Sequence, residues 1–288
     1  LHKHSREWDA IVAARTREET EHIAQQIRSL LPPIVIVEPY VIPIDFWALS
    51  PMGPCRRNRR ISVPSWEMIQ QNYQTNARDA MSRLAWLTPQ TVDGGQLILV
   101  HGRPGTGKTF FARALGWEWR KWCEVSYIVD SENFWGMNGD SNYMLRVLLD
   151  MEESQAKTEA DGQGEKWRLF IAEDADEYLT SDAKARSGEA MSRLLNIVDG
   201  IVGQGLRILF FLTTNEPVEK LHPAVSRSGR CLANIEVGAL SKDEANDWLL
   251  TNGVGGFVES DTVLADLYAM RRQPPIRHVV ESLVGFRK

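Results

Sequence analysis

The residues best suited to chemistry form a glycine-rich run between two apolar stretches. The run reads Gly-x-x-x-x-Gly-Lys-Thr, from Gly102 to Thr109. Glycines let backbone N–H groups converge on phosphate oxygens, because no Cβ blocks the approach. A strand-like segment precedes the run and a helix-like segment follows it, which is the context that this pattern requires. The run therefore predicts a binding site for a nucleoside triphosphate.

Each position of this run has an expected role. Lys108 is predicted to contact the β- and γ-phosphates of ATP, and the Thr109 hydroxyl to ligate Mg²⁺. The helix that begins near Lys108 adds the positive end of its dipole to the site. We therefore expect ATP and Mg²⁺ as ligands. The other residues predicted to bind the nucleotide are Gly102, Pro104, Gly105, Thr106, Gly107 and Phe110.

Further polar groups are expected beside the phosphates, at the ends of two apolar segments. One segment ends in Glu173 and Asp174, and another ends in Asn215. The carboxyl ends of parallel strands share one edge of a sheet, where ligands bind. A carboxylate there can hold the Mg²⁺ shell or polarise the attacking water, and a neutral amide can orient that water. We favour Asp174 as the base and Glu173 as the metal-shell acid, although the spacing leaves this assignment open.

The elements that position these residues follow from an alternation of segments. Strand-like and helix-like segments alternate from residue 96 to residue 239, which predicts a parallel sheet with helices on both faces. Only helical patterns follow, opened by a capping box of Ser241 and Glu244. The predicted fold class is α/β: a P-loop nucleoside-triphosphatase sheet, followed by a small all-helical lid and preceded by an α+β N-terminal region.

The N-terminal region has its own pattern. Residues 5–31 have helical spacing, residues 34–49 indicate edge strands interrupted by proline, and residues 50–60 form a basic, turn-rich linker. This linker is either solvated or in contact with an acidic partner. Three domains are expected: an N-terminal region (1–70), a nucleotide-binding domain (71–239) and a helical lid (240–288).

Composition narrows the class of protein. The 288 residues are 43% apolar and 25% charged, as in ordinary globular proteins, and the net charge of −5 argues against a generally basic nucleic-acid-binding protein. No apolar run reaches the ~18 residues of a membrane span, and the first residues lack the apolar core of a signal peptide. The 3 cysteines form no metal-ligand pair, and their odd number favours reduced thiols. Together these features predict a cytoplasmic protein.

The order of the motifs resembles that of AAA+ ATPases, specifically the AAA clade. The glycine-rich loop, the acidic strand end, "TTN" and "HPAVSRSGR" follow one another at that family's spacing, and the resemblance covers about residues 72–288. It implies a homo-oligomeric ring, commonly a hexamer, that hydrolyses ATP at subunit interfaces. It also implies that Asn215 is sensor 1. Arg227 and Arg230 would be arginine fingers, which stabilise transition-state charge in the neighbouring site.

The sequence departs from the family pattern in two places. The family's acidic pair reads Asp-Glu, whereas this chain has Glu173 followed by Asp174. A mitochondrial member of the family has the same order, so activity is still expected. The lid is short, and Arg277 is either a sensor 2 arginine that contacts the nucleotide or a solvated, capping arginine.

An aromatic loop is the last candidate site. The stretch "SENFWGMNGD" has the composition of a turn, yet Phe134 and Trp135 precede Gly136 within it. In the family, a pore loop that reads aromatic–hydrophobic–Gly faces the central channel. The resemblance therefore implies that these residues grip a polypeptide substrate, with Phe134 favoured, and that residues 179–189 form a second pore loop. The alternative is that both rings pack in the core.

Three functions compete on this evidence. The leading hypothesis is a motor that remodels or threads a protein substrate through a ring. A DNA-acting loader or initiator would favour basic pore loops and a helix-turn-helix, neither of which is found, so a nucleic-acid partner is disfavoured. An ATP-binding scaffold with little turnover is supported only by the reversed acidic pair. A small-molecule kinase would not explain Arg227 and Arg230.

Overall fold

A computed structural model gives the fold of two compact units, Leu1–Pro39 and Tyr40–Lys288. The structure describes residues 16, 19–23, 26, 40–92, 95–136, 142–149, 166–179, 194–197, 205–221, 225 and 229–271. In the first unit, the described residues include a helical turn at 19–23, where Glu19 N donates to Thr16 Oγ1 at 3.2 Å. The site and the sheet described below belong to the second unit.

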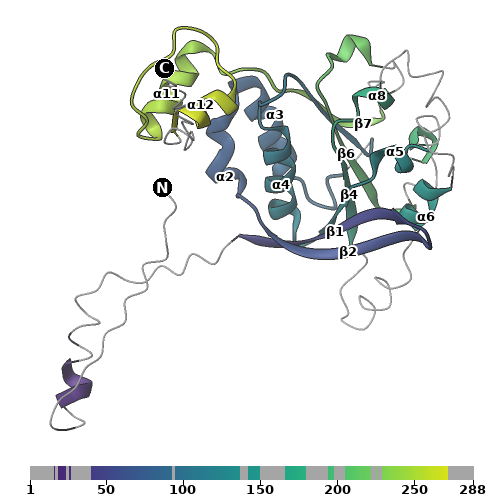
Figure 1. The fold of residues 1–288 in the computed structure, drawn as a ribbon, viewed down its shortest axis with the longest axis horizontal. Coiled ribbons are helices and arrows are strands. Elements are labelled where there is room, and N and C mark those ends of the chain that lie inside the picture. Colours follow the sequence, from purple (N-terminus) through teal and green to yellow (C-terminus); the bar gives the residue numbers. More distant parts are fainter. Residues whose placement is uncertain are drawn as a thin grey trace, which may run out of the picture. The chain divides into compact units, whose positions relative to one another are not determined.

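A seven-stranded sheet in the order β2-β1-β4-β5-β6-β3-β7 forms the centre of the second unit, as far as the chain is described (Figure 1). All neighbouring strands run parallel except β1 and β2, which form an antiparallel hairpin. The central strands β3, β5 and β6 are almost wholly apolar because helices cover both of their faces. The strands are β1 (Val41–Ser50), β2 (Gly53–Ser62), β3 (Leu97–His101), β4 (Cys123–Ile128), β5 (Trp167–Ala172), β6 (Ile208–Thr214) and β7 (Cys231–Glu236).

Helices pack on the two faces of this sheet. Alternate strand residues point to opposite faces, so Leu97 and Leu99 join one core and Ile98 and Val100 the other. The second core includes α2 (Trp66–Ile69), α3 (Thr75–Ala85) and α4 (Lys108–Trp119), with the 3₁₀ turn η1 (Gln70–Asn72) between α2 and α3. The first core includes α5 (Ser131–Phe134), α6 (Tyr143–Leu149) and α8 (Asp176–Leu179). The predicted α/β fold with helices on both faces is confirmed.

The N-terminal boundary differs from the prediction. Residues 41–62 were expected to lie outside the nucleotide-binding domain, but β1 pairs in parallel with β4, from Ile44 opposite Val125 to Trp47 opposite Ile128. The compact unit begins at Tyr40 rather than after residue 70. The expected linker at 50–60 is mostly strand β2, since arginines are well tolerated on an exposed sheet edge.

A small helical lid follows the sheet. It contains α11 (Lys242–Thr251) and α12 (Leu264–Arg271). Leu240 and Thr262, which precede these helices, form an antiparallel β-bridge. Ser241 Oγ accepts from Glu244 N, and Glu244 Oε2 accepts from Ser241 N, so the predicted capping box is present. The lid has its own core, formed by Leu240, Ala245, Trp248, Leu249, Leu264 and Leu267. The described part of the predicted lid, up to residue 271, is therefore helical as expected.

Candidate nucleotide-binding site

The glycine-rich loop lies where the sequence predicts, between the end of β3 and the start of α4. Gly105 and Gly107 have φ angles of 79° and 97°, which side-chain-bearing residues rarely adopt. A Cβ on Gly105 would lie 2.9 Å from the Ala265 Cβ, and one on Gly107 would lie 2.9 Å from Leu264 Cδ2. These glycines thus serve two needs at once, because they shape the loop and they admit helix α12 beside it.

Lys108 is the central cation of the site. Its side chain is buried, and Nζ donates to the carbonyl oxygens of Gly102 (2.7 Å) and Arg103 (3.1 Å) and to Asn215 Oδ1 (2.8 Å). Burial lowers the pKa of Lys108, while the charge of Asp174 opposes that shift. The ammonium group is therefore held at the carboxyl edge of the sheet by exchangeable hydrogen bonds. Phosphate oxygens could replace these acceptors.

Asn215 links the lysine to two carboxylates. Its Oδ1 accepts from Lys108, while its Nδ2 donates to Asp174 Oδ1 at 3.3 Å and to Asp176 Oδ2 at 3.2 Å. Asp176 Oδ1 also accepts from the Asn215 backbone N–H at 2.6 Å and from the Thr214 hydroxyl. Asp176 therefore orients Asn215, and sequence reasoning missed it. The available signal was the third carboxylate of "EDAD", which comes two residues after the expected pair.

The acidic pair has two different environments. Glu173 is half-buried, and its Oε2 accepts from the Tyr127 hydroxyl at 2.9 Å, while its Oε1 is buried with no hydrogen-bond partner in the described chain. Burial and then the Glu173 charge raise the pKa of Tyr127, which keeps this hydroxyl protonated as a donor. Asp174 is exposed, with a left-handed φ of 50°. Asp174 is thus the more accessible carboxylate, and Tyr127 is a second contact that the sequence did not reveal.

The remaining residues of the glycine-rich loop differ in exposure. Thr109 is exposed at the start of α4, so its hydroxyl is accessible. Thr106 is buried, and its Oγ1 donates to the Arg103 carbonyl at 2.9 Å, which closes the turn around exposed Pro104.

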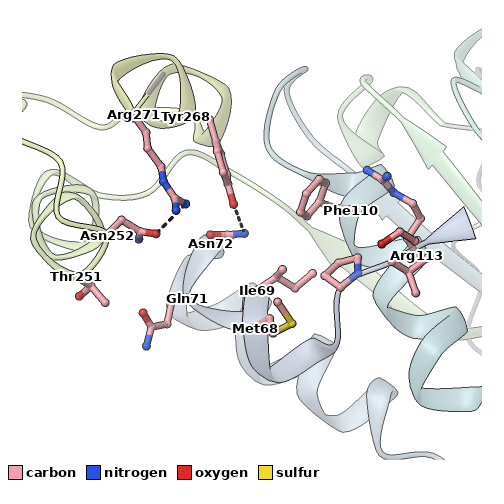
Figure 2. Close-up of a pocket in the computed structure, with 13 residues that line it drawn as sticks. Met68, Ile69, Gln71, Asn72, Phe110, Arg113, Thr251, Asn252, Tyr268 and Arg271 are labelled. Carbon is pink, nitrogen blue, oxygen red and sulfur yellow. Dashed lines mark hydrogen bonds between the residues drawn. The ribbon is translucent and has the colours of Figure 1, made fainter. Parts of the chain in front are cut away.

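A cavity of about 450 Å³ lies next to this loop (Figure 2). Phe110, which directly follows Thr109, lines it together with side chains from α2, η1 and the lid. The Arg113 guanidinium lies 4.7 Å from the centre of the Phe110 ring. Lining residues are joined by hydrogen bonds from Asn72 Nδ2 to the Tyr268 hydroxyl (3.3 Å) and from Arg271 to Asn252 Oδ1 (3.2 Å) (Figure 2). The Phe110 ring therefore forms an aromatic wall of this cavity, one residue after the glycine-rich loop.

Arg230, the one predicted arginine among the described residues, does not lie at the glycine-rich loop of its own chain. The Arg230 carbonyl accepts from Leu97 N at 3.2 Å, so Arg230 lies beside the start of β3, whereas the loop follows the end of that strand. At a rise of ~3.3 Å per residue, the Arg230 backbone is at least ~13 Å from the loop of its own chain. Arg227 and Arg277 lie outside the described residues.

The aromatic loop differs from the pore-loop prediction. Phe134 and Trp135 are each 1% exposed, and Trp135 stacks on Tyr178 with ring centres 5.4 Å apart. This is the arrangement of the core-packing alternative, because both rings belong to the hydrophobic core that also contains residues of the sheet, α6 and α8. Gly136 has a φ of 76° and ends the turn. Apart from Leu179, which is buried, the expected second pore loop at 179–189 lies outside the described residues.

The residues present fit a nucleotide with a bound Mg²⁺ ion. In the described ranges, no group of three or more His, Cys, Asp or Glu is arranged to hold a metal ion by itself. Mg²⁺ in nucleotide sites is held by one or two protein ligands together with phosphates and water. The exposed Thr109 hydroxyl and the unpartnered Oε1 of Glu173 suit such a site.

This fold and site define a P-loop nucleoside triphosphatase. A glycine loop joins a buried strand to a helix, and its lysine contacts a polar side chain from the end of the neighbouring strand β6. Residues 98–239 match the family described as "ATPase family associated with various cellular activities (AAA)". This matched segment, just under half of the chain, is therefore an AAA-type P-loop domain. Residues 2–85 match a second family, described as a domain of unknown function (DUF5925).

Several known proteins are similar to this chain. The "Probable mitochondrial chaperone bcs1" of Schizosaccharomyces pombe is 27% identical over 231 residues, which is 77% of this chain and 46% of that protein. "Mitochondrial chaperone BCS1" of Bos taurus is 28% identical over 77% of this chain and 49% of that protein. "Cell division cycle protein 48 homolog" of Archaeoglobus fulgidus is 27% identical over 62% of this chain and 26% of that protein. The chain thus spans less than half the length of each of these relatives.

No helix in the described ranges is long and apolar enough to cross a membrane.

Proposed function

We propose that this protein hydrolyses ATP at the interfaces of a homo-oligomeric ring, commonly a hexamer, and thereby remodels or threads a protein substrate. The observation that carries the proposal is the hydrogen-bonded chain from Lys108 through Asn215 to Asp174, at the carboxyl edge of the sheet. It places a cation, an amide and an accessible carboxylate beside the phosphate loop. A cytoplasmic location remains part of the proposal, and two of the relatives are named as mitochondrial chaperones.

Each residue of this hydrogen-bonded series, and each of its neighbours in the site, has a proposed role. Lys108 exchanges its carbonyl acceptors for phosphate oxygens, and Asp174 accepts a proton from the attacking water, which Asn215 orients. Thr109 and Glu173 would hold Mg²⁺, which offsets the charge on the phosphates. The loop glycines bind the phosphates, and the nucleotide base lies against Phe110 in the 450 Å³ cavity.

Arg230 supports a site shared between subunits. Its backbone is at least ~13 Å from its own loop, so its guanidinium is more readily delivered to a neighbour than to its own nucleotide. The resemblance gives Arg227 the same role and makes Arg277 a sensor 2 residue. A protein substrate is supported by the relatives that are named as chaperones. Phe134 and Trp135 contribute no support, because their rings are buried.

The test is a mixing experiment with two variants that should each be inactive. An Arg230→Ala subunit has an intact loop but supplies no Arg230 side chain to the neighbouring site. A Lys108→Ala subunit supplies that arginine but has an impaired loop. We expect turnover per subunit of the wild type to rise with protein concentration, and mixed variants to regain part of it. Arg83→Ala, an exposed arginine on α3, is the control. Turnover that is independent of concentration and survives in Arg230→Ala would rule out the shared site.

A further inference from the structure

The outer edge of strand β2 combines an open backbone with a dense positive charge. Within the described part of the chain, β2 pairs only with β1 and forms the end of the sheet (Figure 1). Four of the five residues from 56 to 60 are arginines, in a chain whose net charge is −5. We name Arg56, Arg57, Arg59 and Arg60 the arginine edge. It concentrates charge opposite in sign to the net charge of the chain.

The arginines lie on both faces of the sheet. Arg57 and Arg59 are opposite Phe46 and Ile44, which belong to the core face that α4 covers. Arg56 is opposite Trp47, which belongs to the other core, and Arg60 shares its face because residues two or four apart point the same way. A ligand that lies along the edge would therefore meet guanidinium groups above and below the plane of its backbone.

Three of these arginines have no acidic partner within the described chain. Arg56 lies 3.9 Å from Asp45 and its guanidinium is 5.8 Å from the centre of the Trp47 ring, so it is held in place. By contrast, Arg57, Arg59 and Arg60 are exposed, and among contacts to described residues Arg59 donates to the Asn58 carbonyl at 3.4 Å. Three exposed guanidinium groups with no acidic partner in the described residues are suited to bind carboxylates.

We propose that the arginine edge binds an extended acidic segment of a partner protein, which adds to the sheet as a further strand beside β2. An added strand satisfies the outward backbone N–H and C=O groups of β2, and its side chains alternate between the two faces where the arginines lie. A nucleic acid would match the charge but not the backbone hydrogen bonds. The edge therefore fits a polypeptide better than a phosphodiester chain.

The test uses a fluorescent peptide as long as β2, with alternating Glu and Thr. We expect the wild-type protein to bind it, and the double variant Arg57→Glu/Arg59→Glu to bind at least ~10-fold more weakly, because both cations are replaced by repelling charges. A control variant with the same charge change at exposed sites outside the edge, Lys121→Glu/Lys242→Glu, should bind like the wild type. Circular dichroism and ATP turnover, compared with the wild type, verify that both variants are folded.

Two further probes separate the proposal from simple charge attraction. A peptide with the same charges but N-methylated at alternate residues cannot form the backbone ladder, so its binding should fall to the level of the Arg57→Glu/Arg59→Glu variant. A single-stranded oligonucleotide should bind more weakly than the peptide. Equal binding of the N-methylated peptide, tighter binding of the oligonucleotide, or no effect of the double variant would each overturn the proposal.

Discussion

Two loops at the same edge of the sheet have opposite properties. The loop after β3 has glycine backbone and the Lys108 ammonium group at the proposed nucleotide site, whereas the segment after β4 buries Phe134 and Trp135 in the core. Both follow parallel strands, so position at the carboxyl edge does not by itself make a binding loop. The side chains decide the outcome, because glycine and lysine cannot fill an apolar space while two large aromatic rings can.

Removing the cation of the first loop should have the largest effect. Lys108→Ala deletes the donor to Gly102, Arg103 and Asn215, so we expect ATP turnover to fall at least ~100-fold, as with other charge-stabilising groups in active sites. Nucleotide binding and phosphate release would measure it. Lys121→Ala, an exposed lysine beyond α4, should leave both unchanged. Retained turnover in Lys108→Ala would show that the loop is not the phosphate site.

The second loop can be tested by truncating its buried ring. Trp135→Ala should destabilise the fold by about 3–5 kcal/mol, since it removes a buried indole that stacks on Tyr178. Urea unfolding measures this loss, and Trp86→Ala is a matched control because Trp86 is 73% exposed. Unchanged stability together with lost substrate-stimulated turnover would instead assign Trp135 to substrate binding, and the contrast between the two loops would fail.

A smaller effect is expected from the carboxylate that orients Asn215. Asp176→Asn keeps the size of the side chain but removes the charge that accepts from the Asn215 backbone and the Thr214 hydroxyl. We expect turnover to fall ~10-fold or more while the Kd for ATP stays within a few-fold, because Asn215 loses its orientation rather than its presence. Asp79→Asn, an exposed aspartate on α3, is the control. An equal loss in ATP affinity would place Asp176 in nucleotide binding instead.

The smallest effect is expected where the lid meets α3. Burial raises the pKa of Glu244, but hydrogen bonds from Ser241 and then Thr75 outweigh this and lower it. A lowered folded pKa gives stability that is present above the unfolded pKa of ~4.3 and is lost as the pH falls through the folded value. Glu244→Gln should therefore cost about 0.5–1 kcal/mol at neutral pH, given its exposure, and nothing at low pH. Thermal unfolding at both pH values measures this, and a pH-independent difference would contradict it.

The glycine-rich loop could be predicted because the residues that form it are consecutive in the sequence. The spacing from Gly102 to Thr109 determines the loop, and the apolar runs before Glu173 and Asn215 identify two strand ends. Tyr127 and Asp176 could not be found in this way. Their roles depend on contacts with residues 46 and 39 positions away, which only the assembled sheet defines.

The hairpin of β1 and β2 was not predictable for a related reason. Strand β2 is an edge strand in which residues 57–60 are all exposed, so it lacks the alternation of apolar and polar residues that marks a strand. The placement of β1 beside β4 joins residues about 80 positions apart, and sequence periodicity contains no information on such a pair. The aromatic loop shows the opposite case. The family's pore-loop pattern is present in the sequence, but the side chains of Phe134 and Trp135 are buried in the core.

The contact between the glycine-rich loop and helix α12 has a consequence for the rate of nucleotide exchange. Ala265 N donates to the Gly105 carbonyl at 2.9 Å, and a methyl group on Gly105 would collide with Ala265. The loop therefore cannot change shape around an incoming phosphate without breaking that bond or carrying α12 with it. Nucleotide binding at the loop and movement of the lid are then thermodynamically linked. A partner that binds the lid would change the affinity for nucleotide by the same factor as nucleotide changes the affinity for that partner. A neighbouring molecule that grips α12 could thus delay or hasten the exchange of spent nucleotide without touching it.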